Sequence, residues 1–153
     1  MNTTASVTSL TAQERAGISG NTEGLDSDET HRILAVDDDP MILDLMVATL
    51  SGQRYQVDVA RTCKDALPLI LFRDYCGVIL DLLLPDANGL SLYRHIARRR
   101  PGLRSRVIIV TGAMDRDEAR RFVKLIDTQV LLKPFRLGDL VKAVRHIESR
   151  PPR

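Results

Sequence analysis

The chain has 153 residues, which is enough for one domain with a hydrophobic core and short for two. Hydrophobic residues make up 44% and charged residues 27%, as in an ordinary soluble globular protein. The longest apolar candidate, GVILDLLLP, is interrupted by Asp81 and falls short of the ~18–20 residues of a membrane helix. The first residues also lack a secretory signal, so we expect a cytoplasmic protein without a membrane anchor.

Charge is distributed unevenly along the chain. Residues 1–30 contain one arginine and five acids, a net charge of −4, so the remainder carries +6 of the total of +2. Ser, Thr, Gly and Asn dominate this first segment, and few large apolar side chains are available to offset the entropy of ordering. We therefore expect a disordered polar tail over residues 1–30, one domain over 31–149, and a short tail or linker start over 150–153.

Apolar clusters and helical patterns alternate from residue 32 onward. They predict strands at 33–36, 55–60, 77–80, 107–110 and 129–132, and helices at about 40–52, 63–73, 89–100, 115–126 and 137–148. Pro40 suits the first turn of a helix, and Gly52 is expected to end that helix. Pro68 lies inside the second predicted helix and should kink it or restrict it to the first turn. Gly89 is expected to allow a tight turn, and Pro101 with Gly102 to stop the third helix.

The order of strand then helix, repeated five times with almost continuously apolar strands, predicts an α/β fold. Such strands form a parallel sheet with helices on both faces, joined by right-handed crossovers. The best match is a flavodoxin-like (βα)5 doubly wound sheet with strand order 2-1-3-4-5, in which a site lies at the carboxyl ends of the strands.

Polar residues follow four of the predicted strands. Asp37, Asp38 and Asp39 follow the first strand, and Asp81 ends the third. Thr111 follows the fourth strand and Lys133 the fifth. A solvated turn would explain the acids, but adjacent carboxylates repel, so a divalent cation among them is the sharper hypothesis. Asp81 at the end of a buried strand also needs a partner.

The two cysteines and three histidines show no metal-site spacing. Cys63 and Cys76 stand apart from each other and from His31, His95 and His146, and no histidine adjoins a nucleophile. We interpret them as ordinary thiols and isolated histidines.

The joint pattern of VDD, VILDLLLPDANG, VTG and KPF resembles the receiver domain of two-component response regulators, of the CheY-like type, over about residues 32–149. The resemblance implies that Asp81 accepts a phosphoryl group from a histidine kinase or a histidine phosphotransfer protein. It also implies a Mg²⁺ cofactor, with direct coordination by Asp38, water-mediated coordination by Asp37, and contributions from Asp81 and the backbone carbonyl of Leu83. Such a site needs about six oxygen ligands, some of them water.

Two further residues complete the site implied by the resemblance. The ammonium of Lys133 is expected to pair with one phosphoryl oxygen and the hydroxyl of Thr111 to donate to another. The Lys133–Pro134 bond is expected to be cis, as in the family. Asp39 remains open between flanking the metal site and capping the following helix.

Two features depart from the family pattern. Val130 stands at the switch position where an aromatic side chain is common, so signalling is expected through the TGAMD loop and the helix after it. Leu83 and Ala113 stand two residues after Asp81 and Thr111, and neither can orient an attacking water. We expect slow autodephosphorylation and no enzymatic turnover, because a phosphatase of this type would need a second acid at position 83.

The remaining expectations concern partners. A downstream protein partner is not identifiable, and a homodimer through the helices at 115–126 and 137–148 with the strand at 129–132 is implied by resemblance only. The basic cluster at 98–106 is attributed to the end of a helix, without direct nucleic-acid binding. The alternatives are a stand-alone receiver or the amino-terminal receiver of a longer regulator, since SRPPR could begin a linker.

Overall fold

The structure, a computed structural model, describes residues 31–112, 114–126 and 128–150. The predicted polar tail at 1–30 and residues 151–153 lie outside these ranges, so the expectation of disorder stays a prediction. Within the described ranges no helix combines the length and apolar character needed to cross a membrane.

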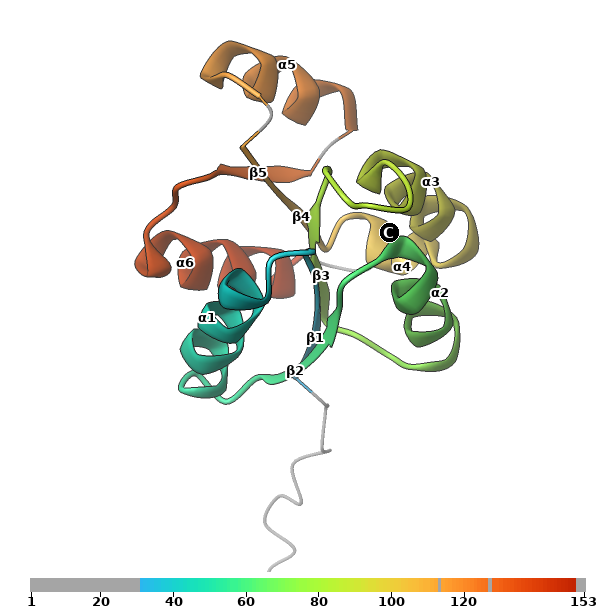
Figure 1. The fold of residues 1–153 in the computed structure, drawn as a ribbon, viewed down its shortest axis with the longest axis vertical. Helices are drawn as coiled ribbons and strands as arrows, with labels where there is room; N and C mark the ends of the chain where they lie inside the picture. The colour runs from blue at the N-terminus through green and yellow to red at the C-terminus, as the bar shows by residue number, and fades with distance from the viewer. Residues whose placement is uncertain (1–30, 113, 127, 151–153) are drawn as a thin grey trace, which may run out of the picture.

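A five-stranded parallel sheet forms the centre of the molecule (Figure 1). Its order is β2-β1-β3-β4-β5, which confirms the predicted topology. The strands are β1 (Arg32–Val36), β2 (Gln56–Ala60), β3 (Gly77–Asp81), β4 (Val107–Thr111) and β5 (Gln129–Leu132). Strands β3 and β4 are buried along their whole length, as expected for apolar strands that are covered on both faces.

In the described part of the chain, six helices surround the sheet: α1 (Pro40–Ser51), α2 (Cys63–Phe72), α3 (Gly89–Arg99), α4 (Pro101–Arg104), α5 (Arg116–Ile126) and α6 (Leu137–Glu148). Helices α1 and α6 cover one face, and α2, α3 and α4 cover the other (Figure 1). Successive strand residues point to opposite faces, so neighbours such as Ile79 and Leu80 enter different cores. Each face therefore has its own apolar cluster, and the sheet separates them.

Three details of the helices refine the sequence prediction. Helix α3 ends before Pro101, as predicted. Pro101 then begins a further short helix, α4, where its missing N–H falls at the first helical position and costs no hydrogen bond. Pro68 lies inside α2 as expected, and the helix continues past it to Phe72 instead of being restricted to its first turn. Helix α1 ends at Ser51 and Gly52 is its C-cap, as predicted, but Gly52 keeps a right-handed φ of −64° and the left-handed residue of this turn is Arg54 at φ 71°.

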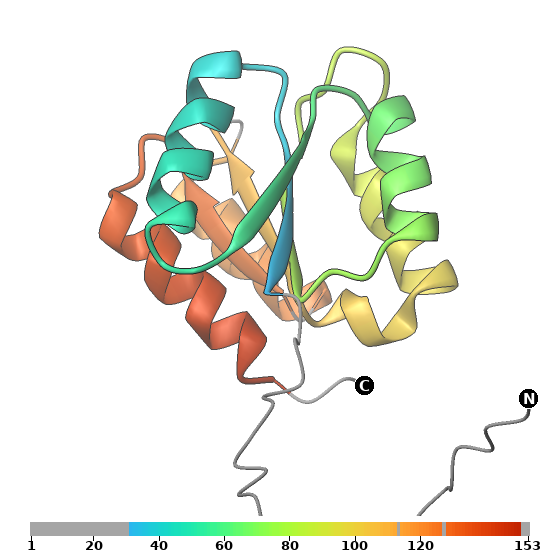
Figure 2. The same cartoon turned by 90° about the horizontal axis from the view of Figure 1, so that it is seen from below.

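The strand register determines where the polar residues gather. Val36 pairs with Leu80, and Asp81 pairs with Val110, so the ends of β1, β3 and β4 are level with one another. On the other side of β4, Thr111 pairs with Leu132, the residue before Lys133. The carboxyl ends of these strands consequently form one edge, while the start of β1, α4 and the end of α6 lie at the opposite end of the sheet (Figure 2).

Candidate functional site

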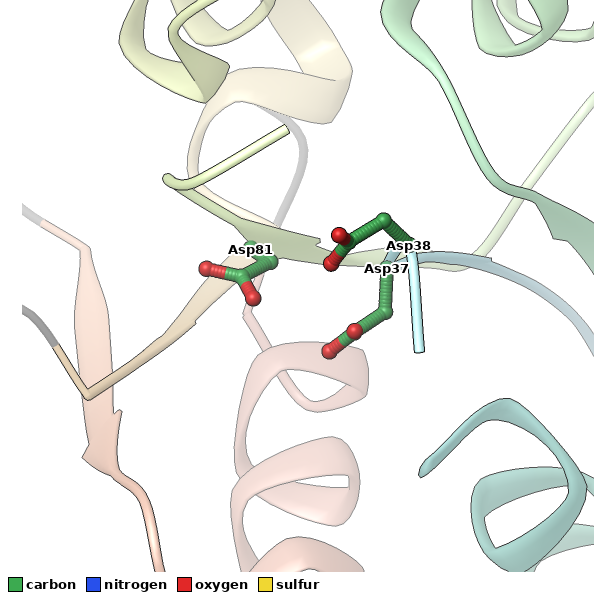
Figure 3. A group of neighbouring side chains, drawn as sticks. All are labelled: Asp37, Asp38 and Asp81. Carbon is green, nitrogen blue, oxygen red and sulfur yellow. The ribbon is translucent and has the colours of Figure 1, made fainter. Parts of the chain in front are cut away.

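Three aspartates converge at the carboxyl edge of the sheet (Figure 3). Asp37, Asp38 and Asp81 each place a carboxylate oxygen within 4.8 Å of those of the other two. Asp37 and Asp81 are almost fully buried, at 1% and 4% exposure, whereas Asp38 is exposed. The predicted acidic cluster therefore forms, with two carboxylates inside the protein and one facing solvent.

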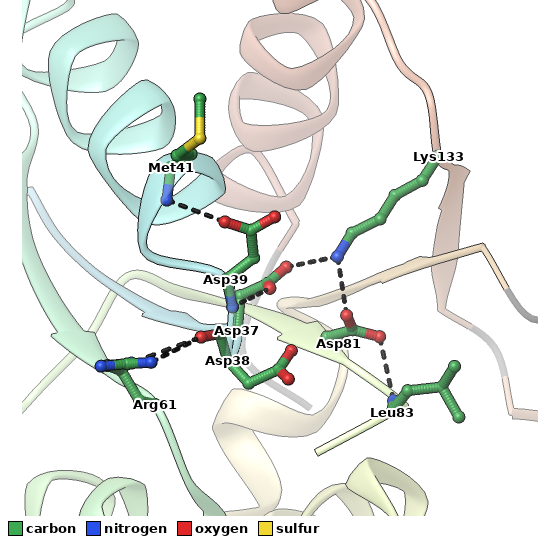
Figure 4. Close-up of polar contacts among 8 residues, drawn as sticks. All are labelled: Asp37, Asp38, Asp39, Met41, Arg61, Asp81, Leu83 and Lys133. Carbon is green, nitrogen blue, oxygen red and sulfur yellow. Dashed lines mark hydrogen bonds and ion pairs between the residues drawn. The ribbon is translucent and has the colours of Figure 1, made fainter. Parts of the chain in front are cut away.

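Lys133 connects the two buried carboxylates (Figure 4). Its Nζ lies 2.6 Å from Oδ2 of Asp37 and 2.7 Å from Oδ2 of Asp81. The backbone N–H of Lys133 donates to the carbonyl of Thr111 over 3.0 Å, which fixes the start of the side chain beside the end of β4. The following bond to Pro134 is cis, as predicted. One ammonium thus compensates part of the negative charge of the cluster.

Burial and charge act in opposite directions on these groups. Burial raises the pKa of Asp37 above its ordinary value, although hydrogen bonds from Lys133 and from the Asp39 backbone act to lower it. Burial alone would lower the pKa of Lys133, but its hydrogen bonds and charge interactions with Asp37 and Asp81 raise it above the ordinary value. Lys133 is therefore a firmly protonated cation, and Asp37 is a carboxylate whose ionised form benefits from additional positive charge.

Backbone contacts orient the acids. The N–H of Leu83 donates to Oδ1 of Asp81 over 2.9 Å, which leaves Oδ2 to Lys133. The N–H of Asp39 donates to Oδ1 of Asp37 over 3.0 Å. The side chain of Asp39 accepts from the N–H of Met41 at 2.9 Å and caps α1. Of the two roles left open for Asp39, capping is the one that the structure shows.

Gly89 stands against the backbone of the central aspartate. A Cβ at this position would lie 2.1 Å from the carbonyl oxygen of Asp81 and 2.9 Å from Cα of Leu82. The N–H of Gly89 donates to the carbonyl of Leu82 over 2.9 Å. The expected reason for this glycine, a tight turn, was therefore incomplete, because close packing of α3 on the end of β3 excludes any side chain.

The remaining predicted residues lie around this edge. Thr111 is fully buried at the end of β4. Leu83 is exposed and forms an isolated bridge with Asn88. Val130 is half-buried on β5 and packs against the core cluster on the α2 and α3 face. Ala113 lies outside the described residues, and the metal-binding and switch roles of Leu83 and Val130 stay predictions.

Two contacts near the acids were missed from the sequence. The Arg61 guanidinium donates to the carbonyl of Asp38 over 3.1 and 3.3 Å, and so ties the acidic turn to the end of β2. The carboxylate of Asp86 accepts 2.9 Å hydrogen bonds from the N–H groups of Cys63 and Lys64, which hold its pKa below the ordinary value. The position of Asp86 five residues after the end of the third strand was the one sequence signal for its contact with the start of α2. No sequence pattern indicated the contact of Arg61.

The isolated thiols were interpreted correctly. Cys63 and Cys76 are both free cysteines. His31, in contrast, is paired, because its Nδ1 lies 2.5 Å from Oε1 of Glu148 at the end of α6. The phenol of Tyr55 donates to the other carboxylate oxygen of Glu148 over 2.7 Å. These contacts join the start of β1 to α6, away from the acidic edge.

A five-stranded parallel α/β fold with buried acids and a lysine at its carboxyl edge defines the class of receiver-like proteins. The family model for the response regulator receiver domain matches residues 33–145, and the chain belongs to that family.

Two of the curated relatives are named as regulatory proteins. The transcriptional regulatory protein DltR of Streptococcus agalactiae is 31% identical over 114 residues, which cover 74% of this chain and 50% of DltR. The response regulator ArlR of Staphylococcus aureus is 29% identical over 121 residues, 79% of this chain and 54% of ArlR. The chain thus spans about half the length of these curated relatives.

Among solved structures, a CheY-like receiver domain protein from Methanospirillum hungatei JF-1 has a TM-score of 0.68 and 30% identity. The match covers 76% of this chain and 92% of that one.

Proposed function

We propose that the chain is a phosphoacceptor in two-component signalling, in which Asp81 receives a phosphoryl group from a histidine kinase or histidine phosphotransfer protein. The observation that carries the proposal is the arrangement of Asp81 itself. Its Oδ1 accepts from the Leu83 N–H, its Oδ2 pairs with Lys133, and two further carboxylates lie within 4.8 Å. This arrangement would orient the proposed nucleophile and surrounds it with a cation and with carboxylates that could hold a metal ion.

The transfer requires few chemical groups from the protein. An oxygen of the Asp81 carboxylate would attack phosphorus while the bond from phosphorus to the donor's imidazole nitrogen breaks. The imidazole keeps the electron pair and takes up a proton, and Asp81 becomes an acyl phosphate. Lys133, already 2.7 Å from Asp81, would pair with one phosphoryl oxygen, and the buried Thr111 is assigned the role of donating its hydroxyl to another.

The acidic cluster fits a magnesium cofactor. Asp37, Asp38 and Asp81 offer hard oxygen ligands, and the backbone carbonyl of Leu83 is proposed as a fourth. The raised pKa of Asp37 supports this assignment, because Lys133 alone does not offset the cost of burying that charge. When bound, Mg²⁺ would supply positive charge beside a phosphoryl oxygen.

The output is proposed to be a changed protein surface rather than catalytic turnover. Val130 has a stiff and short side chain, so the loop and helix that follow Thr111 are the proposed moving parts. The downstream partner is a protein that binds this surface in the cytoplasm. A homodimer through α5, β5 and α6 is a further candidate, because a shallow cavity of about 610 Å³ lies between these elements. Direct contact with nucleic acid or membrane is not part of the proposal.

A longer regulator is the second candidate. The chain corresponds to about half of the length of DltR and ArlR, and DltR is named a transcriptional regulator. In that case this receiver would control an additional output region, and a reading frame that continues past Arg153 would establish it. A phosphatase is disfavoured, because the exposed Leu83 offers no acid two residues after Asp81.

The experiment is incubation with acetyl phosphate and MgCl₂, followed by intact-mass measurement. The wild type should gain one phosphoryl group, and Asp81→Asn should gain none. Asp44→Asn, which removes an exposed acid of α1 outside the site, is the matched control and should be labelled like the wild type. Labelling of Asp81→Asn at the wild-type level would overturn the proposal.

A further inference from the structure

An arginine patch occupies the end of the sheet opposite to the acidic site. It consists of Arg98, Arg99, Arg100, Arg104 and Arg106 at the end of α3, in α4 and before β4. Three of these arginines border a cavity of about 360 Å³ together with Tyr75. The position at a helix C-terminus favours Arg98 and Arg99, but it does not explain the arginines that follow α3.

The charge of the patch is poorly compensated. Arg100 forms an ion pair with Asp74, and the guanidinium of Arg106 donates to the backbone carbonyl of Arg150 over 3.1 and 3.3 Å. Within residues 31–112, 114–126 and 128–150, the patch has one carboxylate partner for five arginines.

Three arginines of the patch have no acidic partner among the described residues. Arg98, Arg99 and Arg104 are all exposed, and none of them contacts an acid of the described chain. Their surface therefore suits an anionic ligand.

The sequence just before β1 carries a segment of opposite charge. Residues 23–29, EGLDSDE, contain four acids and no base, and they end two residues before His31. These residues lie outside the described ranges, but their point of attachment is the start of β1, at the same end of the sheet as α4 (Figure 2).

The acidic segment is attached near enough to the arginine patch to reach it. The backbone N–H of Cys76 donates to the carbonyl of Arg32, and the N–H of Val78 donates to that of Arg106, so the starts of β1, β3 and β4 adjoin in order. The start of β1 and Arg106, directly before β4, are therefore two strand spacings apart, or about 10 Å. A seven-residue segment can extend over ~20 Å.

We infer that the acidic segment at residues 23–29 docks on the arginine patch of the same chain. A short tether keeps the local concentration of the segment in the millimolar range, so several weak charge pairs suffice for binding. The docked segment would occupy the patch in the free protein, and any anionic partner would first have to displace it. The inference is independent of phosphorylation at Asp81, which lies at the other end of the sheet.

The test uses the full chain labelled with ¹⁵N and measures amide chemical shifts of residues 23–29. The triple variant Arg98→Gln, Arg99→Gln, Arg104→Gln should change these shifts in about 20 mM NaCl, where charges are weakly screened. Raising NaCl to about 500 mM should move the wild-type signals to the positions of the variant. The variant itself should respond little to salt.

A reciprocal variant and a matched control complete the design. Neutralising the segment with Glu23→Gln, Asp26→Asn, Asp28→Asn and Glu29→Gln should shift the amide signals of residues 98–106. Neutralising three exposed lysines outside the patch, at positions 64, 124 and 142, should leave the segment as in the wild type. Unchanged core amide signals in each variant confirm folding.

Two results would overturn the inference. One is identical segment shifts in the wild type and the arginine variant at low salt. The other is a difference that grows with protein concentration, because the segment would then be binding a second copy.

Discussion

Replacing Gly89 by alanine tests how closely α3 must approach the acidic edge. The added Cβ would lie 2.1 Å from the carbonyl oxygen of Asp81, and ordinary contact begins near 3.4 Å, so backbone must move by 1.3 Å. The obstacle is main chain and cannot rotate away. Overpacking of this kind costs about 1–3 kcal/mol or more, and the higher helix propensity of alanine returns at most ~1 kcal/mol. We expect a net loss of about 2 kcal/mol of stability.

The displacement should also affect the phosphoryl acceptor. The added Cβ would overlap with the backbone carbonyl of Asp81 itself. Misplacement of a reacting group by ~1 Å can reduce a rate by 10²-fold. Urea unfolding should show a midpoint lower by about 1 M at an m-value of ~2 kcal/mol/M. Labelling by acetyl phosphate should slow by ~10-fold or more.

Gly138→Ala is the matched control for this prediction. Gly138 is also in the first turn of a helix, α6, and a Cβ added there would meet no heavy atom within 4 Å. This variant should unfold at the wild-type midpoint or slightly above it, with unchanged labelling. If Gly89→Ala behaved as Gly138→Ala does, the steric reasoning would be refuted.

Three further changes have distinct outcomes. Lys133→Met should lower the free energy of unfolding at pH 7 by ~2–4 kcal/mol, because two buried carboxylates lose their cation, and MgCl₂ should restore part of it in urea titrations. Asp58→Asn should cost ~1–3 kcal/mol by weakening contacts to two arginines and a tyrosine. The pKa of Asp58 is lowered despite burial, because these partners stabilise its charge. The stabilisation by ionised Asp58 is therefore fully present above about pH 3.8 and is lost as the pH falls further. The difference in free energy of unfolding between wild type and Asp58→Asn should narrow over that range, and a constant difference would contradict this reasoning. Leu83→Asp should shorten the lifetime of the phosphorylated protein by ~10-fold through acid/base catalysis, whereas Leu45→Asp, at an exposed leucine of α1, should not.

The topology was predictable because it depends on patterns that the sequence carries locally. Continuously apolar runs such as VIIV, each separated from the next by a helical pattern, are typical of a parallel sheet that helices cover on both faces. The same argument placed Asp37, Asp81 and Lys133 on one edge, because parallel strands end on the same side. Their contacts at 2.6 and 2.7 Å agree with that placement.

The details that sequence did not provide depend on tertiary packing. Helix α4 was missed because PG is a stop signal, although proline at a first helical position permits a new turn. The left-handed residue after α1 is Arg54 rather than a glycine, which propensity does not predict. Arg61 reaches Asp38 across 23 residues, and no local pattern encodes such a contact.

Locating the phosphoryl group itself is the decisive test of Asp81 as the acceptor. Wild-type protein is incubated with acetyl phosphate, with or without MgCl₂, then reduced with borohydride, which converts an aspartyl phosphate to homoserine, and its peptides are sequenced by mass spectrometry. We expect homoserine at position 81 alone, and only when Mg²⁺ is present. Homoserine at another aspartate, or equal modification without Mg²⁺, would contradict the proposed role of Asp81 and its metal.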